Sequence, residues 1–339
     1  MTMTNGASPL DDFRALALAP LPDHGAARAE AEARQTQLIK PAGSLGRLED
    51  IALWLASVTG KPPRVESPRV VVFAAAHGVA DEGVSAFPLS VNSAMLAAFR
   101  EGHAAINQMC AASNVALSVF DLALDVPSGN IAVEDAFASS RATAATLAFG
   151  LEAINQVDCL GLGEMGIANT TVAAALYTAL FGGTGADWVG AGTGVEGATL
   201  AHKADVVDRV VARVAGERDP LVLLQRIGGR EIAAMAGAIL AARSQNVPVV
   251  IDGFVATAAA ALIHAIHPDA IAHCLFAHRS AEAAHGRVLE RLGVVPLLDL
   301  GMRLGEGTGA ALALSIVRAA AACHSDMATF AEAGVAGPA

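Results

Sequence analysis

Two glutamates stand where a side chain could act as a base. Glu164 follows the apolar run VDCLGLG (157–163), and Glu306 lies in GMRLGEGTG (301–309), just after the run VPLLDLG (295–301). Both runs are typical of buried strands, and both glutamates lie beside glycine, so each carboxyl group should be partly removed from water. Such burial raises the pKa of a carboxyl group and makes it a better base near neutral pH. A structural role is the commoner one for an isolated glutamate, so the setting makes both residues candidates only.

A second candidate site is the segment GLGEMGIANTT (161–171), which has the form strand, glycine turn and helix start. Asn169 or Thr170 can cap the helix there. The first-turn N–H groups and the positive end of the helix dipole remain free to bind an anion such as phosphate. An ordinary capped turn between strand and helix has the same form, and the segment alone does not separate the two interpretations.

The segment VGAGTGVEGATLAHK (189–203) favours the phosphate interpretation. Gly190, Gly192 and Gly194 let successive backbone amides form an anion-binding concavity, and Lys203 adds a positive charge about two turns along a helix. The G-x-G-x-G run lacks the final spacing of a dinucleotide fingerprint and does not follow a long first strand. An NAD-dependent oxidoreductase is therefore disfavoured.

Metal-site patterns are missing from the sequence. Five histidines crowd residues 264–285, but only His264 and His267 form an H-x-x-H pair and there is no H-E-x-x-H. The cysteines lie far apart without a C-x-x-C pair, which predicts neither a disulfide framework nor a cysteine zinc site and favours a reduced, cytoplasmic setting; they are Cys110, Cys159, Cys274 and Cys323.

Three other polar residues follow apolar runs. His77 and His278 stand at strand ends and are expected to line the cleft as hydrogen-bonding groups. Asp252 follows the run VPVVI and is either a substrate contact or a cap for the helix that begins at FVATAAA, and we favour the cap.

Composition excludes several classes of protein. The chain has 339 residues, 54% of them hydrophobic, and a net charge of −11 with 22 scattered basic residues, which argues against a nucleic-acid groove. The N-terminus lacks a basic segment followed by an apolar core, so it does not resemble a signal peptide. Residues 165–186 carry no charge, but asparagine, threonine and glycine interrupt them, which predicts a buried helix and no membrane contact.

The fold follows from alternation. Apolar, β-branched runs at 69–76, 115–124, 157–163, 247–253, 271–277 and 295–301 are separated by alanine-rich segments of helical length. This pattern predicts an α/β fold, a doubly wound, Rossmann-like parallel sheet with helices on both faces. We expect a large domain over 65–307 and a small helical domain built from 1–64 and 308–339. Ligands bind at the carboxyl ends of strands in such sheets.

Several motifs together resemble one enzyme family. They are KPAGSLGRLE (40–49), HGVADEGVSAFP (77–88), GEMGIANTT (163–171), VPVVIDGF (247–254), SAEAAHG (280–286) and MRLGEGTGAALAL (302–314). In the same order, these are similar to motifs of the nicotinate-nucleotide:dimethylbenzimidazole phosphoribosyltransferases of cobalamin biosynthesis. The resemblance runs from about residue 30 to about residue 325, and the six motifs are specific only as a set.

The resemblance implies transfer of 5-phosphoribose from nicotinate mononucleotide to 5,6-dimethylbenzimidazole, which gives α-ribazole 5′-phosphate and nicotinate without a metal or other cofactor. It implies that Glu306 is the general base and that Glu164 also lies in the active site. The residues expected to hold the nucleotide are Gly166, Ala168, Asn169, Thr170 and Lys203. The segment 190–194, called the glycine-rich turn below, adds Gly192 and Gly194. The base-binding residues implied are Phe87, Met95, Ser280, Arg303 and Leu304.

The family resemblance also implies a homodimer with a Rossmann-like large domain and a small helical one. The sequence departs from the family pattern at Ala76, where an aspartate commonly precedes HGV, and the match is loosest over 87–95. Both departures concern the acceptor base, so another benzimidazole or a purine stays open. A non-catalytic nucleotide-binding homologue is the other alternative. Retention of Glu164 and Glu306 argues against it, whereas Ala76 argues for it.

Overall fold

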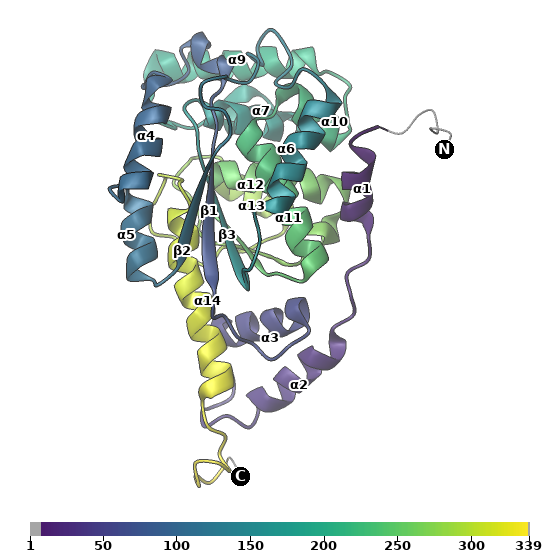
Figure 1. Cartoon of the computed structure of the whole chain (residues 1–339), viewed down its shortest axis with the longest axis vertical. Coiled ribbons are helices and arrows are strands. Elements are labelled where there is room, and N and C mark those ends of the chain that lie inside the picture. Colours follow the sequence, from purple (N-terminus) through teal and green to yellow (C-terminus); the bar gives the residue numbers. More distant parts are fainter. Residues whose placement is uncertain (1–7, 338–339) are drawn as a thin grey trace.

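The computed structural model describes residues 8–337, whose centre is a five-stranded parallel sheet between two layers of helices (Figure 1). The strand order is β2-β1-β3-β4-β5, and every neighbouring pair is parallel. The strands are β1 (Pro68–Ala74), β2 (Ala116–Asp121), β3 (Cys159–Met165), β4 (Val249–Ile251) and β5 (Cys274–Phe276). This order confirms the doubly wound sheet. Its direction of progression reverses at β1 and β3, where ligands bind in such sheets.

Alternate residues of the central strand β1 pack on opposite faces of the sheet. Val71 and Phe73 belong to the core on the side of α11 (Arg230–Gln245) and α12 (Phe254–Ile266). Val70 and Val72 belong to a second core, on the side of α14 (Thr308–Asp326). Since both faces are covered, the strand is apolar from Val70 to Ala74, as the unbroken run VVVFA indicates.

The remaining helices connect the strands or cover the sheet edges. They are α1 (Asp11–Leu18), α2 (Gly25–Gln35), α3 (Arg47–Thr59), η1 (Gly78–Glu82), α4 (Ser90–Glu101), α5 (Ala105–Ala112), α6 (Ser140–Glu152), α7 (Asn169–Phe181), α8 (Gly185–Trp188), α9 (Gly197–Arg213), α10 (Pro220–Ile227), η2 (Pro268–Ile271) and α13 (His285–Leu292). Most residues of α7 are fully buried, in agreement with the buried helix expected for the uncharged stretch. None of the helices in the described part of the chain is both long and apolar enough to cross a membrane.

Helices from the two ends of the chain lie together below the sheet (Figure 1). α3 packs against both α2 and α14, and Arg34 in α2 donates to the carbonyl oxygens of His324 and Ser325 at the end of α14. α1 lies elsewhere, against α11 and α12 on the sheet. The first half of α14 also packs on the sheet, against β3, β4 and β1. The small helical domain therefore stays a prediction, and α1 departs from its expected place in it.

The expected strand over 295–301 was wrong. Only Leu298 forms an isolated bridge, with His278, and no strand follows β5 in the described chain. Leu297 N donates to the carbonyl oxygen of Phe276, the last residue of β5, at 2.9 Å, and Leu298 N donates to that of Ala277 at 3.0 Å. Pro296 has no N–H to extend the ladder, so the contact stays short and the segment runs on as a loop toward Glu306.

Candidate active site

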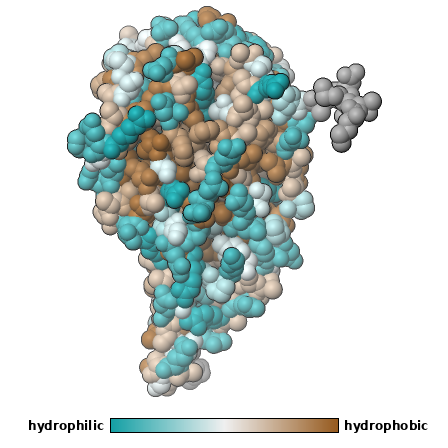
Figure 2. All heavy atoms as spheres, in the orientation of Figure 1, coloured by the Kyte–Doolittle hydropathy of each residue, from teal (hydrophilic) through white to brown (hydrophobic). Residues whose placement is uncertain are grey.

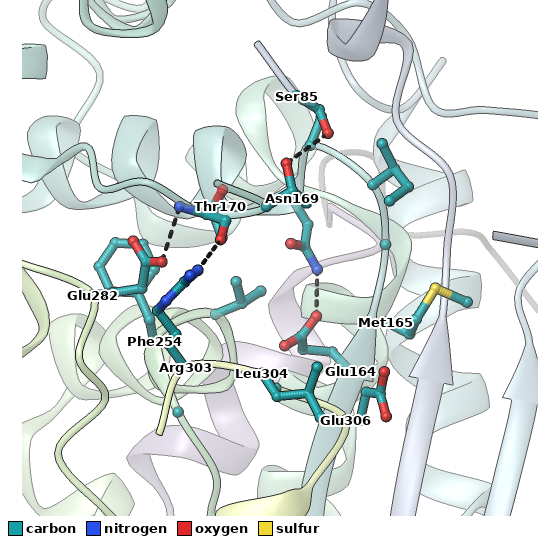
Figure 3. A pocket seen from close by; sticks show the side chains of 18 of the residues that line it. Ser85, Glu164, Met165, Asn169, Thr170, Phe254, Glu282, Arg303, Leu304 and Glu306 are labelled. Carbon is teal, nitrogen blue, oxygen red and sulfur yellow. Dashed lines mark hydrogen bonds between the residues drawn. The ribbon is translucent and has the colours of Figure 1, made fainter. Parts of the chain in front are cut away.

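A cavity of about 650 Å³ opens at the carboxyl edge of the sheet, next to the point where the strand order reverses (Figure 3). Most residues expected at the site line it. These are Phe87, Met95, Glu164, Gly166, Ala168, Asn169, Thr170, Gly192, Ser280, Arg303, Leu304 and Glu306. Gly194 and Lys203 do not line it. The expected residues that line the cavity come from five separate stretches of sequence that meet in one place.

Glu164 and Glu306 lie side by side at the floor of the cavity (Figure 3). The two segments are joined because Glu306 N donates to the Glu164 carbonyl oxygen at 3.0 Å. Asn169 Nδ2 donates to Glu164 Oε2. Within residues 8–337, Glu306 Oε2 has no hydrogen-bond partner although it is shielded from solvent. One carboxyl group is thus held in place by the protein, and the other belongs to a residue that lines the cavity and keeps an unpaired acceptor.

Burial shifts the protonation of both acids in the same direction. Desolvation raises the pKa of Glu306 to about 7. For Glu164, desolvation and then the charges of Glu231 and Asp252 raise the pKa to about 8, against the opposing hydrogen bond from Asn169. Near pH 7, Glu306 therefore exchanges a proton readily, as a general base requires, while Glu164 mostly holds one.

The turn that carries Glu306 has an uncommon backbone. Gly305, Glu306 and Gly307 have φ of 82°, 61° and 77°, a left-handed conformation that costs a non-glycine residue about 1–2 kcal/mol. Close packing between this turn and β3 explains the glycines on both sides of the contact. A Cβ on Gly163 of β3 would lie 2.3 Å from Gly307 N, and one on Gly305 of the turn would lie 2.6 Å from Glu164 Oε1. The glycines thus let the Glu306 turn lie directly on β3.

Asp252 holds this turn from below. Its carboxyl oxygens accept from Gly307 N at 3.1 Å and from Ala310 N at 2.9 Å, so it caps α14. The preference for a cap over a substrate contact agrees with this position, but the expected helix, α12, was wrong. Desolvation raises the pKa of Asp252 to about 7, against the hydrogen bonds from the α14 N-terminus, which lower it.

The start of α7 forms another wall of the cavity. Ala168 precedes the helix with φ 73°, and Ile167 N donates to the buried Asn92 Oδ1 at 2.9 Å. The residue at the N-cap position, Ala168, makes no side-chain hydrogen bond to the first turn. Asn169 points instead toward Glu164 and Thr170 toward the glycine-rich turn (Figure 3). The positive end of the α7 dipole therefore faces the cavity, as binding of an anion requires.

Lys203 lies behind the wall that Thr170 and Gly192 form. The lysine is 1% exposed, and its Nζ donates to Thr170 Oγ1 at 2.8 Å and to the Gly190 carbonyl oxygen at 3.0 Å. Desolvation lowers its pKa to about 8, and the charge of Glu282 opposes that shift. Gly194 lies further out, with φ 110° and open space where a Cβ would be. The structure thus brings the lysine next to Thr170, one residue removed from the cavity.

The opposite side of the cavity is apolar and partly open. Phe87 and Leu304 are 51% and 56% exposed at the rim, and Met95 also lines the cavity. Arg303 Nη1 reaches over the mouth and donates to the Gly192 carbonyl oxygen at 2.8 Å. Ser280 is buried, and its hydroxyl accepts from Glu282 N at 3.3 Å. A flat aromatic ring would fit this apolar side.

Several cavity residues were not foreseen from sequence. Ser85 and Thr193 join two loops across the rim through hydroxyl groups 3.0 Å apart, Phe254 begins α12, and Glu282 is a buried acid. Glu282 lies inside the motif SAEAAHG, which was the available signal. His278 lines the cavity as expected.

His77 does not line the cavity, so that expectation was wrong. Its ring lies beneath the floor, where Nε2 is 2.9 Å from Glu231 Oε1 and both side chains are at most 1% exposed. Among residues 8–337, no group of three or more histidine, cysteine, aspartate or glutamate side chains could hold a metal ion.

The sheet topology and the cavity at its carboxyl edge define a doubly wound α/β enzyme for a small ligand. Residues 20–335 match the family model described as phosphoribosyltransferase, and the chain therefore belongs to this phosphoribosyltransferase family. The resemblance drawn from the six motifs is thereby confirmed.

Curated relatives match over nearly the whole chain. Nicotinate-nucleotide–dimethylbenzimidazole phosphoribosyltransferases of Methylocella silvestris and Sinorhizobium medicae are 59% and 58% identical, over 99% and 98% of this chain and 99% of each relative. A crystal structure of CobT from Thermus thermophilus superposes with a TM-score of 0.86 at 39% identity, covering 92% of this chain and all of that one. The chain is thus similar to these enzymes in sequence and in fold.

Proposed function

We propose that the protein transfers 5-phosphoribose from nicotinate mononucleotide to 5,6-dimethylbenzimidazole, producing α-ribazole 5′-phosphate and nicotinate for cobalamin biosynthesis. The observation that carries the proposal is the free, buried oxygen of Glu306 beside an apolar cavity wall. The relatives named for this reaction support it.

Glu306 acts as the general base in this proposal. It accepts the N–H proton of the benzimidazole, and the other ring nitrogen attacks C1′ of the ribose as its lone pair becomes more available. The bond from C1′ to the pyridinium nitrogen breaks, and its electron pair neutralises that nitrogen, so nicotinate leaves with a neutral ring nitrogen. Attack from the face opposite the leaving group inverts the β linkage to α, as in other glycosyl transfers.

The remaining residues bind and orient the two substrates. The phosphate lies at the α7 N-terminus, near Gly166, Ala168, Asn169 and Thr170, and Lys203 strengthens this site through Thr170. Glu164, which holds a proton near pH 7, can donate it in a hydrogen bond to a substrate. The benzimidazole lies against Phe87, Met95 and Leu304, near Ser280 and Arg303. Proximity of two rings across one sugar supplies much of the remaining rate.

The test is incubation with nicotinate mononucleotide and dimethylbenzimidazole, followed by chromatography for nicotinate and ribazole phosphate. We expect the two products in equal amounts. A panel of other benzimidazoles and purines tests which base is the acceptor. The choice of base needs this test because the sequence departs from the family pattern at Ala76 and over 87–95. The proposal fails if no base in the panel releases nicotinate.

We further propose that the enzyme is a cytoplasmic homodimer. Phe87 and Leu304 expose apolar surface at the cavity rim, and apolar patches that stay exposed on a single chain often mark an interface. Figure 2 shows apolar side chains gathered on the upper part of the face that it presents. Light scattering should give twice the chain mass of 34.2 kDa. A mass equal to one chain at micromolar concentration would contradict the dimer.

A further inference from the structure

Glu282 is a buried acid that the proposed mechanism does not use. It is 5% exposed and lines the cavity, in the loop that precedes α13 (Figure 3). Its Oε1 accepts from Gly192 N at 2.9 Å. Its Oε2 is shielded from solvent and has no hydrogen-bond partner among residues 8–337. A buried acceptor without a donor is unfavourable, and a ligand that brings donors removes that cost.

The loop holds this carboxylate in a fixed position. Glu282 N donates to Ser280 Oγ, Ala281 N donates to the Met302 carbonyl oxygen at 2.8 Å, and His285 N donates to the Glu282 carbonyl oxygen at 2.9 Å. The glycine-rich turn lies directly against the carboxylate, because a Cβ on Gly190 would lie 1.9 Å from Oε2. Glu282 is therefore placed before any ligand arrives, as preorganised binding requires.

Charges on the two sides of this turn differ. Lys203 and Thr170 lie on one side, since a Cβ on Gly192 would be 3.0 Å from Lys203 Nζ and 2.7 Å from Thr170 Oγ1. The carboxylate of Glu282 lies on the other side and already takes the Gly192 N–H. A phosphate is attracted to the first side and repelled from the second. The second side therefore suits a neutral group that donates hydrogen bonds.

The donor nucleotide has few groups that meet this requirement. Its phosphate and its nicotinate carboxylate are anions, which Glu282 repels, and the pyridinium ring has no N–H or O–H. Only the ribose 2′- and 3′-hydroxyl groups are neutral donors. A carboxylate offers about four lone-pair sites, of which Gly192 uses one, so two neighbouring hydroxyl groups can be accepted together. Acids hold ribose hydroxyl groups in the same way in dinucleotide-binding sheets.

We propose that Glu282 accepts hydrogen bonds from the ribose hydroxyl groups of the nucleotide donor and thereby selects ribosyl over deoxyribosyl donors. This inference rests on the proposed phosphoribosyl transfer. It assigns the specificity for the sugar to one side of the glycine-rich turn and the affinity for the phosphate to the other.

The experiment compares kcat/KM for nicotinate mononucleotide and for its 2′-deoxy and 3′-deoxy analogues. We expect the wild-type enzyme to favour the ribosyl donor by about tenfold to a hundredfold, the range for a hydrogen bond to a charged group. In Glu282→Gln this preference should fall at least about fivefold for one deoxy analogue or both. Glu290→Gln, the same acid-to-amide change at an exposed position of α13, should keep the wild-type preference.

Each outcome separates the two proposals. A merely structural role for Glu282 would lower the rate with all three donors equally and leave the preference unchanged, which would overturn the inference. A wild-type enzyme that uses both deoxy donors as well as the ribosyl donor would also overturn it, and this measurement needs no variant that must fold. If wild-type enzyme releases no nicotinate from any donor, the proposed function itself fails.

Discussion

Glu306 combines a buried carboxyl group with a left-handed backbone, and both properties follow from its neighbours. Gly305 and Gly307 allow the turn to touch β3, and the turn holds the carboxyl group at the cavity floor. The sequence therefore made this residue a candidate through its flanking glycines, while its free oxygen became visible only in the structure.

The first prediction at this scale concerns Glu306→Gln. The amide keeps the size of the side chain but cannot take a proton, so kcat should fall by roughly 10²–10⁴. The KM for nicotinate mononucleotide should change little, because the proposed phosphate site lies at α7. Steady-state kinetics with both substrates measure this split. A variant that no longer folds, judged by circular dichroism, would show that Glu306 is structural.

The second prediction is the pH dependence of kcat/KM. A general base works when deprotonated, so activity should rise with pH through about 7, the pKa of Glu306. If the protonated form of Glu164 binds substrate, activity should fall again as pH rises through about 8. In Glu164→Gln the rise should stay and the fall should disappear. A fall that persists in this variant would point to proton loss from Lys203, whose pKa is also about 8.

The third prediction concerns Lys203→Met, which keeps the volume of the buried side chain and removes its charge. The KM for the nucleotide should rise about tenfold or more, with a smaller change in kcat, because Lys203 donates to Thr170 of the proposed phosphate site. Initial rates at varied nucleotide and varied base separate the two effects. A rise in KM for dimethylbenzimidazole alone would refute the phosphate assignment.

At the scale of elements, Asp252 connects β4 to the start of α14. The fourth prediction is that Asp252→Asn turns one acceptor into a donor facing a backbone N–H, and so lowers the free energy of unfolding by about 1–3 kcal/mol. Because the same contact holds the Glu306 turn, kcat should fall as well, although Asp252 is absent from the cavity lining. Urea denaturation and steady-state rates measure the two effects. Unchanged stability together with unchanged kcat would contradict the role of Asp252 in holding the Glu306 turn.

The same scale shows what sequence could and could not foresee. The apolar runs typical of strands, and the polar residues that follow them, could be found in the sequence because apolar patterning is local. These polar residues included Glu164 and Glu306. The partners of Asp252 lie 55 and 58 residues further along the chain, and Glu282 meets Gly192 across 90 residues. Such contacts depend on which loops meet at the sheet edge. The wrong prediction of a strand over 295–301 has the same cause. Its apolar residues suggested a strand, but in the structure only Leu298 forms a bridge, with His278.

At the scale of the whole molecule, α14 ties the helices from the chain ends to the sheet. It packs on both β3 and α3, and the Glu306 turn lies directly before its first residue. One helix, α14, therefore contacts both the sheet and the helices from the chain ends. The question is whether these two parts unfold as separate domains.

The fifth prediction tests that question with the two tryptophans of the chain. Trp54 lies in α3, and Trp188 is buried beside the α7 core. In Trp188→Phe the remaining Trp54 reports on α3 and its hydrogen bond to the Ala272 carbonyl oxygen, and in Trp54→Phe the remaining Trp188 reports on the α7 core. The two urea transitions should coincide because α14 couples the parts. Both variants must keep wild-type rates as a control. An earlier transition for Trp54 would establish an independently unfolding helical domain.

The position of α14 also bears on how the protein is made. The part of one sheet face that α14 covers, which includes Val70 and Val72, stays exposed until this helix has been synthesised, after all five strands. At ordinary translation rates, its 19 residues take about one to four seconds to make. During that time the growing chain exposes this apolar surface, and the Glu306 turn still lacks the complete helix that follows it. A chain that ends before α14 would therefore lack both the cover of this apolar surface and the helix that follows the Glu306 turn.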